Sequence, residues 1–275
     1  SPVYWIVNVV FLLKITYSWV RAMETHLAHI RRGSVGAMIA AQPVSDHCHN
    51  TAAYAASALE PVKLSAAGKT AGLLHDLGKY SEQFQAYIKD GIGTRGLVNH
   101  TFAGVRLLLE RYHHEPPENL ADIAAELLAL AVGGHHGEFD CVDKGGKSGF
   151  QHRLNKEGIG YEGAVENFFR FCAPLEELDR YVRAAQEELV PVLEHILSMT
   201  GEDADDGRYD EETAFYSGLL ARLLLSAVIE GDRRDTAAFM NGAHFSERQN
   251  AEALQQLWSG CLDRVEEKLD ELPQS

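Results

Sequence analysis

Apolar residues recur at three- and four-residue spacing along most of this chain, which is the period of helices that bury one face. Alternation of apolar and polar residues at every second position, which half-buried strands show, is scarce. The pattern therefore predicts an all-α fold, a helical bundle around one core. The predicted helices cover residues 51–59, 102–109, 120–132, 165–171, 175–197, 214–229 and 254–269.

Glycine, proline and acidic residues mark the predicted loops between these helices. The loops lie at residues 91–93, residues 115–117, the glycine-rich run 137–163 and the acidic turn 201–207. No internal repeat relates the segments between them, so the main part of the chain is expected to be one domain.

Three segments of different character divide the chain. Residues 1–22 are unusually apolar, although polar residues interrupt them and no small-residue cleavage site follows. We expect an apolar leader that derives from vector sequence or a misplaced start codon, with packing on the core or a membrane anchor as the alternatives. Residues 23–245 form the predicted main domain, and residues 246–275 form a predicted C-terminal helix and linker.

The composition is that of a globular protein, with 275 residues of which 45% are hydrophobic and 24% charged. The net charge of -15 argues against a protein that coats nucleic acid through bulk electrostatic attraction, so any such contact must be local. The four cysteines form no C-x-x-C pair, which predicts neither a disulfide framework nor a thiolate zinc site. We therefore expect a cytoplasmic protein with no membrane partner.

Imidazoles and carboxylates, the side chains that bind transition metals, are spread over separate predicted helices. They are His47, the pair His75-Asp76, His100, the pair His135-His136, and Asp232. Single residues or adjacent pairs from several helices are what a two-metal hydrolytic centre needs, because one helix cannot surround an ion. We therefore predict that these side chains converge on a metal cluster.

The dipeptide His75-Asp76 lies between leucines that should face the core. Burying a carboxylate without a partner costs free energy, and a cation removes that cost while also binding the imidazole. Neighbouring side chains of a helix diverge by roughly a quarter turn, so His75 and Asp76 would approach an ion from different sides. The alternative interpretation is a salt bridge at a helix end.

The other histidine candidates lie at predicted helix ends. Asp46 is a predicted N-cap for a helix that begins at His47, and His100 precedes another apolar helix. The pair His135-His136 follows Gly133-Gly134, where glycine permits close backbone approach. Each alone has an ordinary alternative, a solvated or capping histidine at a helix end.

Asp232 and Asp235 both follow the apolar stretch of the helix predicted at 214–229. We predict Asp232 as the ligand, because it directly follows that stretch and a close-packing glycine. Asp235 would instead pair with Arg233 or Arg234, or support the metal site from behind. The remaining histidines have no comparable setting, and these are His26, His29, His49, His113, His114, His152, His195 and His244.

The order His47, His75-Asp76 and Asp232 resembles the signature of the HD superfamily of metal-dependent phosphohydrolases. A longer pattern, which covers about residues 23–240, resembles the HD nuclease domain of the CRISPR-associated type I effector helicase-nuclease. That pattern consists of His-Asp-Leu-Gly-Lys at 75–79, His100 ahead of a helix, Gly-His-His-Gly at 134–137, and the segments 27–30 and 46–47. Two features depart from it, namely Gly231 in place of an alanine and the apolar leader.

The resemblance implies an HD-domain helical bundle that degrades single-stranded DNA unwound by an ATP-driven helicase. The helicase would belong to the same polypeptide or act in trans, and a CRISPR surveillance complex would be a further partner. The alternatives are an HD phosphohydrolase acting on nucleotides or small phosphoesters, and a catalytically idle docking module.

Two divalent ions are expected at the cluster. One would be held by His47, His75, Asp76 and Asp232, and the other by Asp76, His100, His135 and His136. A divalent cation lowers the pKa of water from about 15.7 toward 7, which supplies a nucleophile without a protein base. Imidazole-rich ligands favour Mn, Fe, Co or Ni, with Mg as a further possibility. Besides Asp76, the expected catalytic residue is Lys79, which would stabilise charge on the phosphate unless it is a surface lysine.

A basic segment follows the His135-His136 pair and has no acidic residue between positions 144 and 156. Basic side chains attract the phosphate backbone, and aromatic rings stack on bases, so such a segment can hold a single strand. The expected substrate-binding residues are Lys144, Lys147, Phe150 and Arg153. The alternative is an ordinary solvated loop.

Overall fold

The computed structural model describes residues 26–34, 36–91, 100–137, 149–155, 160–200, 208–242 and 251–270. Most of these residues lie in helices. This confirms the predicted all-α class. The helices are α2 (Val44–Leu59), α3 (Ser65–Leu74), α4 (Glu82–Asp90), α5 (Phe102–Tyr112), α6 (Leu120–Gly134), α7 (Gly149–Leu154), α8 (Tyr161–Phe171), α9 (Leu175–Thr200), α10 (Arg208–Asn241) and α11 (Ala251–Asp270), with the 3₁₀ turns η1 (Glu60–Val62) and η2 (Leu77–Tyr80). Each helix predicted from apolar spacing falls inside one of these helices. The expected leader and the acidic turn 201–207 lie outside the described residues.

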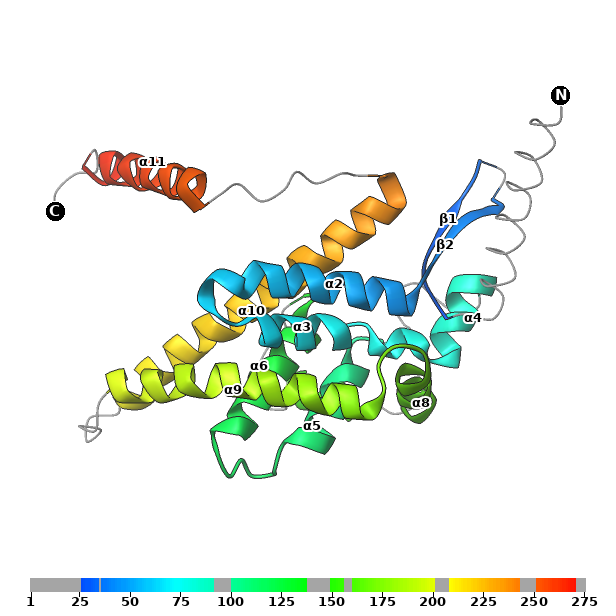
Figure 1. Ribbon diagram of the computed structural model, residues 1–275, viewed down its shortest axis with the longest axis horizontal. Coiled ribbons are helices and arrows are strands. Elements are labelled where there is room, and N and C mark those ends of the chain that lie inside the picture. The colour runs from blue at the N-terminus through cyan, green and yellow to red at the C-terminus, as the bar shows by residue number, and fades with distance from the viewer. Residues whose placement is uncertain are drawn as a thin grey trace. The chain divides into compact units, whose positions relative to one another are not determined.

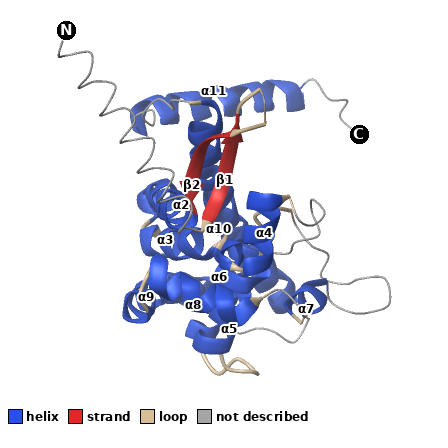
Figure 2. Cartoon of the chain, turned by 90° about the vertical axis from the view of Figure 1, so that its right-hand side faces the viewer, coloured by secondary structure: helices blue, strands red, loops and turns tan. Residues whose placement is uncertain are grey.

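A two-stranded antiparallel hairpin precedes the helices and was missed by the periodicity argument (Figure 2). It consists of β1 (Leu27–Arg32) and β2 (Met38–Pro43). The register shifts between Leu27 and His29 and again between Arg31 and Arg32. Because these irregularities break the two-residue period, the strands carry no clean alternation that a sequence pattern could reveal.

The predicted loop at 137–163 is wrong in two places. Helix α7 occupies Gly149–Leu154, and α8 begins at Tyr161. Gly160 lies in the left-handed region with φ of 64°, which suits a residue without a side chain immediately before a helix. Apolar contacts to the core hold α7, since the Phe150 ring lies 5.6 Å from that of Phe102 between centroids.

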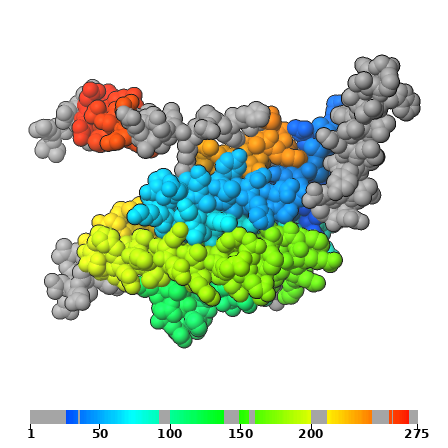
Figure 3. Space-filling model, in the orientation of Figure 1, coloured from blue at the N-terminus to red at the C-terminus, as the bar shows by residue number. Residues whose placement is uncertain are grey.

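Small residues let α2 and α3 approach closely. A Cβ on Gly68 would lie 2.6 Å from the Ala55 carbonyl oxygen, and one on Gly72 would lie 2.7 Å from the Ala52 Cα. Helix α10 packs on α2 and α6, and α9 packs on α3, so α3 is enclosed (Figure 1). In the space-filling view, α2 and α9 make up much of one face of this unit (Figure 3). Helix α3 is therefore held by packing against α2, α6, α9 and α10.

The chain divides into two compact units, residues 1–242 and residues 243–275. The first contains every element up to α10, and the second contains α11. The expected boundaries at residues 22/23 and 245/246 stay predictions. Within the described residues, one segment, Glu211–Asn241 of α10, is long and apolar enough to cross a membrane. That is weak ground for a membrane span, because α10 also supplies buried Leu224 and Val228 to the core.

Candidate metal centre

The His75-Asp76 dipeptide lies where α3 ends, rather than within a continuous helix as expected. His75 is the C-cap of α3, and Asp76, with φ of −114° and ψ of 23°, is the N-cap of η2. Leu74 and Leu77 on either side are fully buried, which holds the break in place. Both side chains of the dipeptide are 0% exposed. The core thus forces an imidazole and a carboxylate into its interior, where they require partners.

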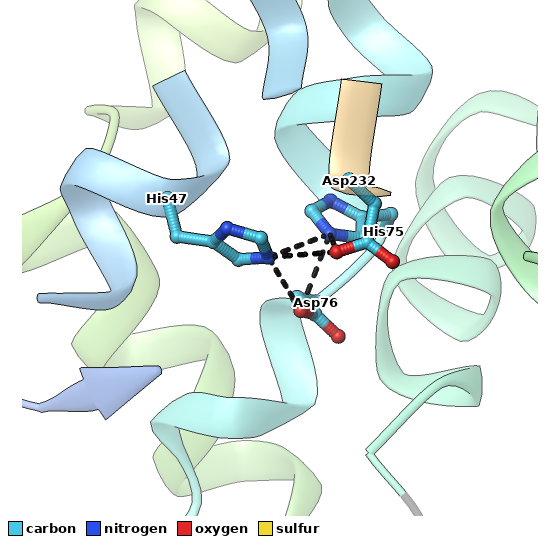
Figure 4. Close-up of side chains that lie close together, drawn as sticks. All are labelled: His47, His75, Asp76 and Asp232. Atoms are coloured by element: carbon cyan, nitrogen blue, oxygen red, sulfur yellow. Dashed lines mark hydrogen bonds and ion pairs between the residues drawn. The ribbon is translucent and has the colours of Figure 1, made fainter. Parts of the chain in front are cut away.

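Two other elements bring ligand atoms to the same point. His47 Nε2 of α2 lies 3.1 Å from Asp76 Oδ2 and 3.2 Å from His75 Nε2. Asp232 Oδ1 of α10 lies 3.3 Å from His47 Nε2 and 3.9 Å from His75 Nε2. Figure 4 shows these four side chains pointing toward one another. We call His47, His75, Asp76 and Asp232 the inner group, because these four ligand atoms lie within 4.8 Å of one another.

The spacing within the inner group is that of ligands around a metal ion. Two ligands with metal bonds of about 2.0–2.1 Å lie roughly 2.9–3.4 Å apart in tetrahedral or octahedral geometry. The distance of 3.2 Å between His75 Nε2 and Asp76 Oδ2 falls in that interval, as do three of the four distances given above. The residues present therefore fit a divalent cation.

A second set of side chains faces the other oxygen of Asp76. His135 Nε2 and His100 Nε2 each lie 3.6 Å from Asp76 Oδ1, and His100 Nε2 lies 2.8 Å from His136 Nε2. We call Asp76, His100, His135 and His136 the outer group, of which Asp76, His135 and His136 also meet the spacing of metal ligands. Asp76 Oδ1 and His135 Nε2 are buried without a hydrogen-bond partner. Since such orphaned acceptors are costly, a cation between them would supply what both atoms lack.

The histidines at the centre share one orientation. His75 Nδ1 donates to the Gly72 carbonyl and His135 Nδ1 to the Val132 carbonyl, both at 2.7 Å. With the proton on Nδ1, the lone pair of each ring lies on Nε2, which faces Asp76. The backbone carbonyls of α3 and α6 therefore preset the form of the imidazole that binds a metal.

Lys79 lies inside the centre and is not the surface lysine that was the alternative. Its side chain is 6% exposed, and its Nζ lies 2.6 Å from Asp76 Oδ2. The ammonium also lies 5.7 Å from the centroid of the Phe84 ring. Asp76 thus has a protein cation on the oxygen that faces the inner group.

The charges of the carboxylates follow from these contacts. Burial raises the pKa of Asp76, but the nearby charges of Lys79 and His75 and the hydrogen bond with His47 outweigh burial and hold that pKa well below its usual value. Burial also raises the pKa of Asp232, but its hydrogen bond with His47 outweighs burial, so the pKa of Asp232 is lowered as well. Both carboxylates are therefore anionic at neutral pH, as metal ligands must be.

The histidines divide into two kinds. Burial lowers the pKa of His47, but hydrogen bonds with Asp232, Asp235 and Asp76 raise it to about 10. Burial lowers the pKa of His75, and burial together with His135 lowers that of His136 to about 4. Positive charge is thus favoured where the carboxylates gather, which is also where a divalent cation would be most stable.

The structure gives Asp232 and Asp235 different positions. Asp232 faces the inner group, whereas Asp235 Oδ2 lies 2.6 Å from His47 Nδ1, on the other side of the ring. Of the two alternatives given for Asp235, pairing with an arginine or support of the metal site from behind, this contact agrees with the second. Gly231 is explained as well, because a Cβ there would lie 2.7 Å from the Thr51 carbonyl oxygen. Glycine lets α10 approach α2 closely enough for Asp232 to reach His47.

His29, which the sequence analysis set aside, lies beside the centre. Its ring packs edge-on against that of His47, with 4.7 Å between centroids, and its Nε2 lies 3.3 Å from Thr236 Oγ1. That hydroxyl donates to Asp232 Oδ1 at 3.3 Å. Burial is the main reason why the pKa of His29 falls to about 3. His29 comes from β1, and the available signal was the segment 27–30, which contains it and carries part of the family resemblance.

The expected substrate-binding residues are described only in part. Lys144 and Lys147 lie outside the described residues. Phe150 and Arg153 lie on α7, with Phe150 partly buried against the core and the Arg153 guanidinium 5.9 Å from the centroid of the Phe102 ring. Their role toward a substrate stays a prediction.

The chain matches a known protein family. Residues 31–227 match the family model described as Cas3, HD domain. The matched region contains every predicted ligand except Asp232, which follows five residues beyond its end. No curated protein matches the chain.

Proposed function

Because this chain belongs to the Cas3 HD-domain family, and so is a CRISPR-associated metal-dependent nuclease, we propose that it hydrolyses phosphodiester bonds of single-stranded DNA with two divalent cations. The observation that carries this proposal is the position of Asp76. One of its oxygens faces the inner group, and the other faces the outer group and has no hydrogen-bond partner. A carboxylate shared in this way supports a two-ion centre over a single site.

The two groups supply the ligands of the two ions. The inner ion would be bound by His47, His75, Asp76 and Asp232, and the outer ion by Asp76, His100, His135 and His136. When bound, such cations lower the pKa of water and neutralise charge on the phosphate. The mixed imidazole and carboxylate ligands favour Mn, Fe, Co or Ni, with Mg a weaker candidate.

The outer group is more exposed than the inner group, so a substrate would approach the centre from the side of the outer group. His136 is exposed and the His100 side chain is 18% exposed, whereas His47, His75 and Asp76 are fully buried. A phosphodiester would therefore meet the outer group first. The predicted strand-binding residues follow His136 in the sequence, namely Lys144, Lys147, Phe150 and Arg153. Lys79 would stabilise negative charge from the buried side of the phosphate.

Single-stranded DNA as substrate implies a partner that unwinds duplex DNA. We propose that a helicase domain, in the same polypeptide or in trans, supplies the strand, and that a CRISPR surveillance complex recruits both. Family membership supports this assignment. In this arrangement the HD nuclease domain is the segment predicted at residues 23–245.

The decisive experiment combines metal analysis with substrate comparison. The purified chain is stripped with a chelator, loaded with Mn, Fe, Co, Ni or Mg, and analysed for bound metal. It is then incubated with single-stranded DNA, double-stranded DNA, single-stranded RNA and nucleotides. We expect about two ions per chain and preferential cleavage of single-stranded DNA. Turnover of nucleotides with indifference to polymer would instead indicate a small-molecule phosphohydrolase, and no turnover would indicate a docking module.

A further inference from the structure

Asp235 lies behind His47, on the opposite side of the imidazole from the other inner ligands. Its Oδ2 accepts a hydrogen bond of 2.6 Å from His47 Nδ1, while His47 Nε2 faces Asp76 at 3.1 Å. With one proton held at Nδ1, the ring would direct its lone pair toward the inner group once a cation takes the place of the proton on Nε2. We propose that Asp235 is the positioning residue of His47 and makes the inner group the tighter of the two ion sites. This inference rests on the two-ion centre proposed above.

Three donors hold the Asp235 carboxylate in place. Gln42 Nε2 of β2 donates to Oδ2 at 2.7 Å, and Asn50 Nδ2 of α2 donates to Oδ1 at 2.7 Å. His47 is the third donor, and the residue is 4% exposed. Because both oxygens already accept hydrogen bonds from the protein, Asp235 acts through His47 rather than as a further ligand. The Gln42 amide makes this bond even though its own Oε1 is buried without a partner.

The hydrogen-bond acceptor at Nδ1 of His47 differs in charge from the acceptors at Nδ1 of His75 and His135. His75 and His135 donate to backbone carbonyls, which are neutral acceptors. A carboxylate acceptor forms a stronger hydrogen bond and makes the imidazole a better electron donor to a cation. His47 is therefore expected to be the strongest histidine ligand of the centre.

The distribution of negative charge favours the same site. The inner group contains two carboxylates, Asp76 and Asp232, with Asp235 directly behind His47. The Lys79 ammonium offsets one of these three negative charges, at Asp76 Oδ2, so the inner group keeps an excess of negative charge. The outer group contains three histidines and shares Asp76 as its carboxylate. A divalent cation therefore gains more electrostatic stabilisation at the inner group, which is also the more buried. Ions should fill the inner site before the outer site.

Calorimetric titration of the metal-free chain with Mn²⁺ tests this. The wild-type protein should show a tight class and a weak class of site. Asp235→Asn keeps the size of the side chain and an acceptor oxygen but removes the charge. We expect this variant to weaken the tight class by about tenfold to a hundredfold, the usual effect of removing such a support, and to leave the weak class unchanged.

Two further variants separate positioning from folding. Asp179→Asn changes a carboxylate that contacts Arg111 and Tyr112, and should leave both classes as in the wild type. Gln42→Met removes one donor to Asp235 and should weaken the tight class by a smaller factor, which keeps a test available if Asp235→Asn folds poorly. Circular dichroism and melting in chelator report the fold of each variant.

The outcomes are distinct. Unchanged affinities in Asp235→Asn, weakening confined to the weak class, or equal weakening of both classes with a lowered melting temperature would each overturn the role of Asp235. A wild-type chain with one class of site would instead overturn the two-ion centre, and with it the asymmetry inferred here.

Discussion

The ammonium of Lys79 lies 2.6 Å from Oδ2 of Asp76, and both side chains are buried. The same oxygen lies 3.1 Å from His47 Nε2 and 3.2 Å from His75 Nε2. Lys79 therefore neutralises Asp76 at the position where the inner ion would also bind. A protein cation and the proposed inner ion would share one carboxylate oxygen, so the stability of the centre should depend on metal.

Replacing Lys79 with methionine should destabilise the metal-free protein more than the metal-loaded protein. Removing one partner of a buried ion pair costs about 3–5 kcal/mol, because the other charge is left unpaired. A bound cation would pair with Asp76 and offset that loss. Urea unfolding in chelator and in Mn²⁺ measures both values. Lys69→Met, which removes an ammonium 4.0 Å from the centroid of the Tyr181 ring, is the control and should respond alike in both conditions. Equal losses for Lys79→Met would contradict this account.

Asp76→Ala should abolish metal-stimulated cleavage of single-stranded DNA, with a loss beyond the roughly hundredfold that a supporting residue costs. The reason is that Asp76 belongs to both groups, so both ions lose a ligand. Circular dichroism should remain helical, since the core leucines around the dipeptide are unchanged. Cleavage at the wild-type rate in a well-folded Asp76→Ala protein would remove the assignment of the centre.

Gly78→Ala should disturb the outer group through the backbone. A Cβ at Gly78 would lie 2.1 Å from the carbonyl oxygen of His100 and 2.6 Å from its Cα, so His100 must move. We expect a destabilisation of about 1–3 kcal/mol, as for overpacking, together with weaker binding of the second ion. Gly163→Ala on α8 is the control, because nothing lies within 4 Å of the added carbon. It should stabilise the helix by up to about 1 kcal/mol. Unchanged metal binding in Gly78→Ala would show that His100 is not a ligand.

Asp179 provides a test of pH dependence away from the metal centre. Hydrogen bonds from Arg111 and Tyr112 hold the pKa of this carboxyl below its usual value, despite the opposing effect of burial. Its ionised form therefore stabilises the fold above the unfolded pKa of about 3.9, and that contribution is lost as the pH falls through the lower folded pKa. Asp179→Asn should cost about 0.2–1 kcal/mol at pH 7, since the pair is partly exposed. The difference in the free energy of unfolding between Asp179→Asn and the wild type should shrink below about pH 3. A difference that grows as the pH falls would contradict a lowered pKa of Asp179.

Lys144 and Lys147 test the expected contact with the strand. Their replacement by alanine should raise the KM for single-stranded DNA while leaving kcat and metal content unchanged. Each lost phosphate contact should reduce the salt dependence of log K by about 0.7. Fluorescence anisotropy with labelled single strands over a range of salt concentrations measures this slope. A slope equal to that of the wild type would show that this segment does not hold the backbone.

The helices and the choice of ligand types were predictable because both depend on local features. Apolar spacing reports which face of a helix is buried, and it placed residues 120–132 and 214–229 inside α6 and α10. The cost of burying a carboxylate between leucines singled out Asp76 without any knowledge of the fold. The amino-acid sequence thus determined the class of fold and the residue types of the centre.

Contacts between distant residues were decided only by the tertiary structure. His29 meets Thr236, and Asp235 meets His47, across 207 and 188 positions of the chain. No local pattern encodes these pairs, because they depend on how β1 and α10 pack against α2. The division of the two Asp76 oxygens between the inner and outer groups depends on the break after α3. Periodicity reports only burial, whereas hydrogen bonding and metal geometry depend on positions in three dimensions.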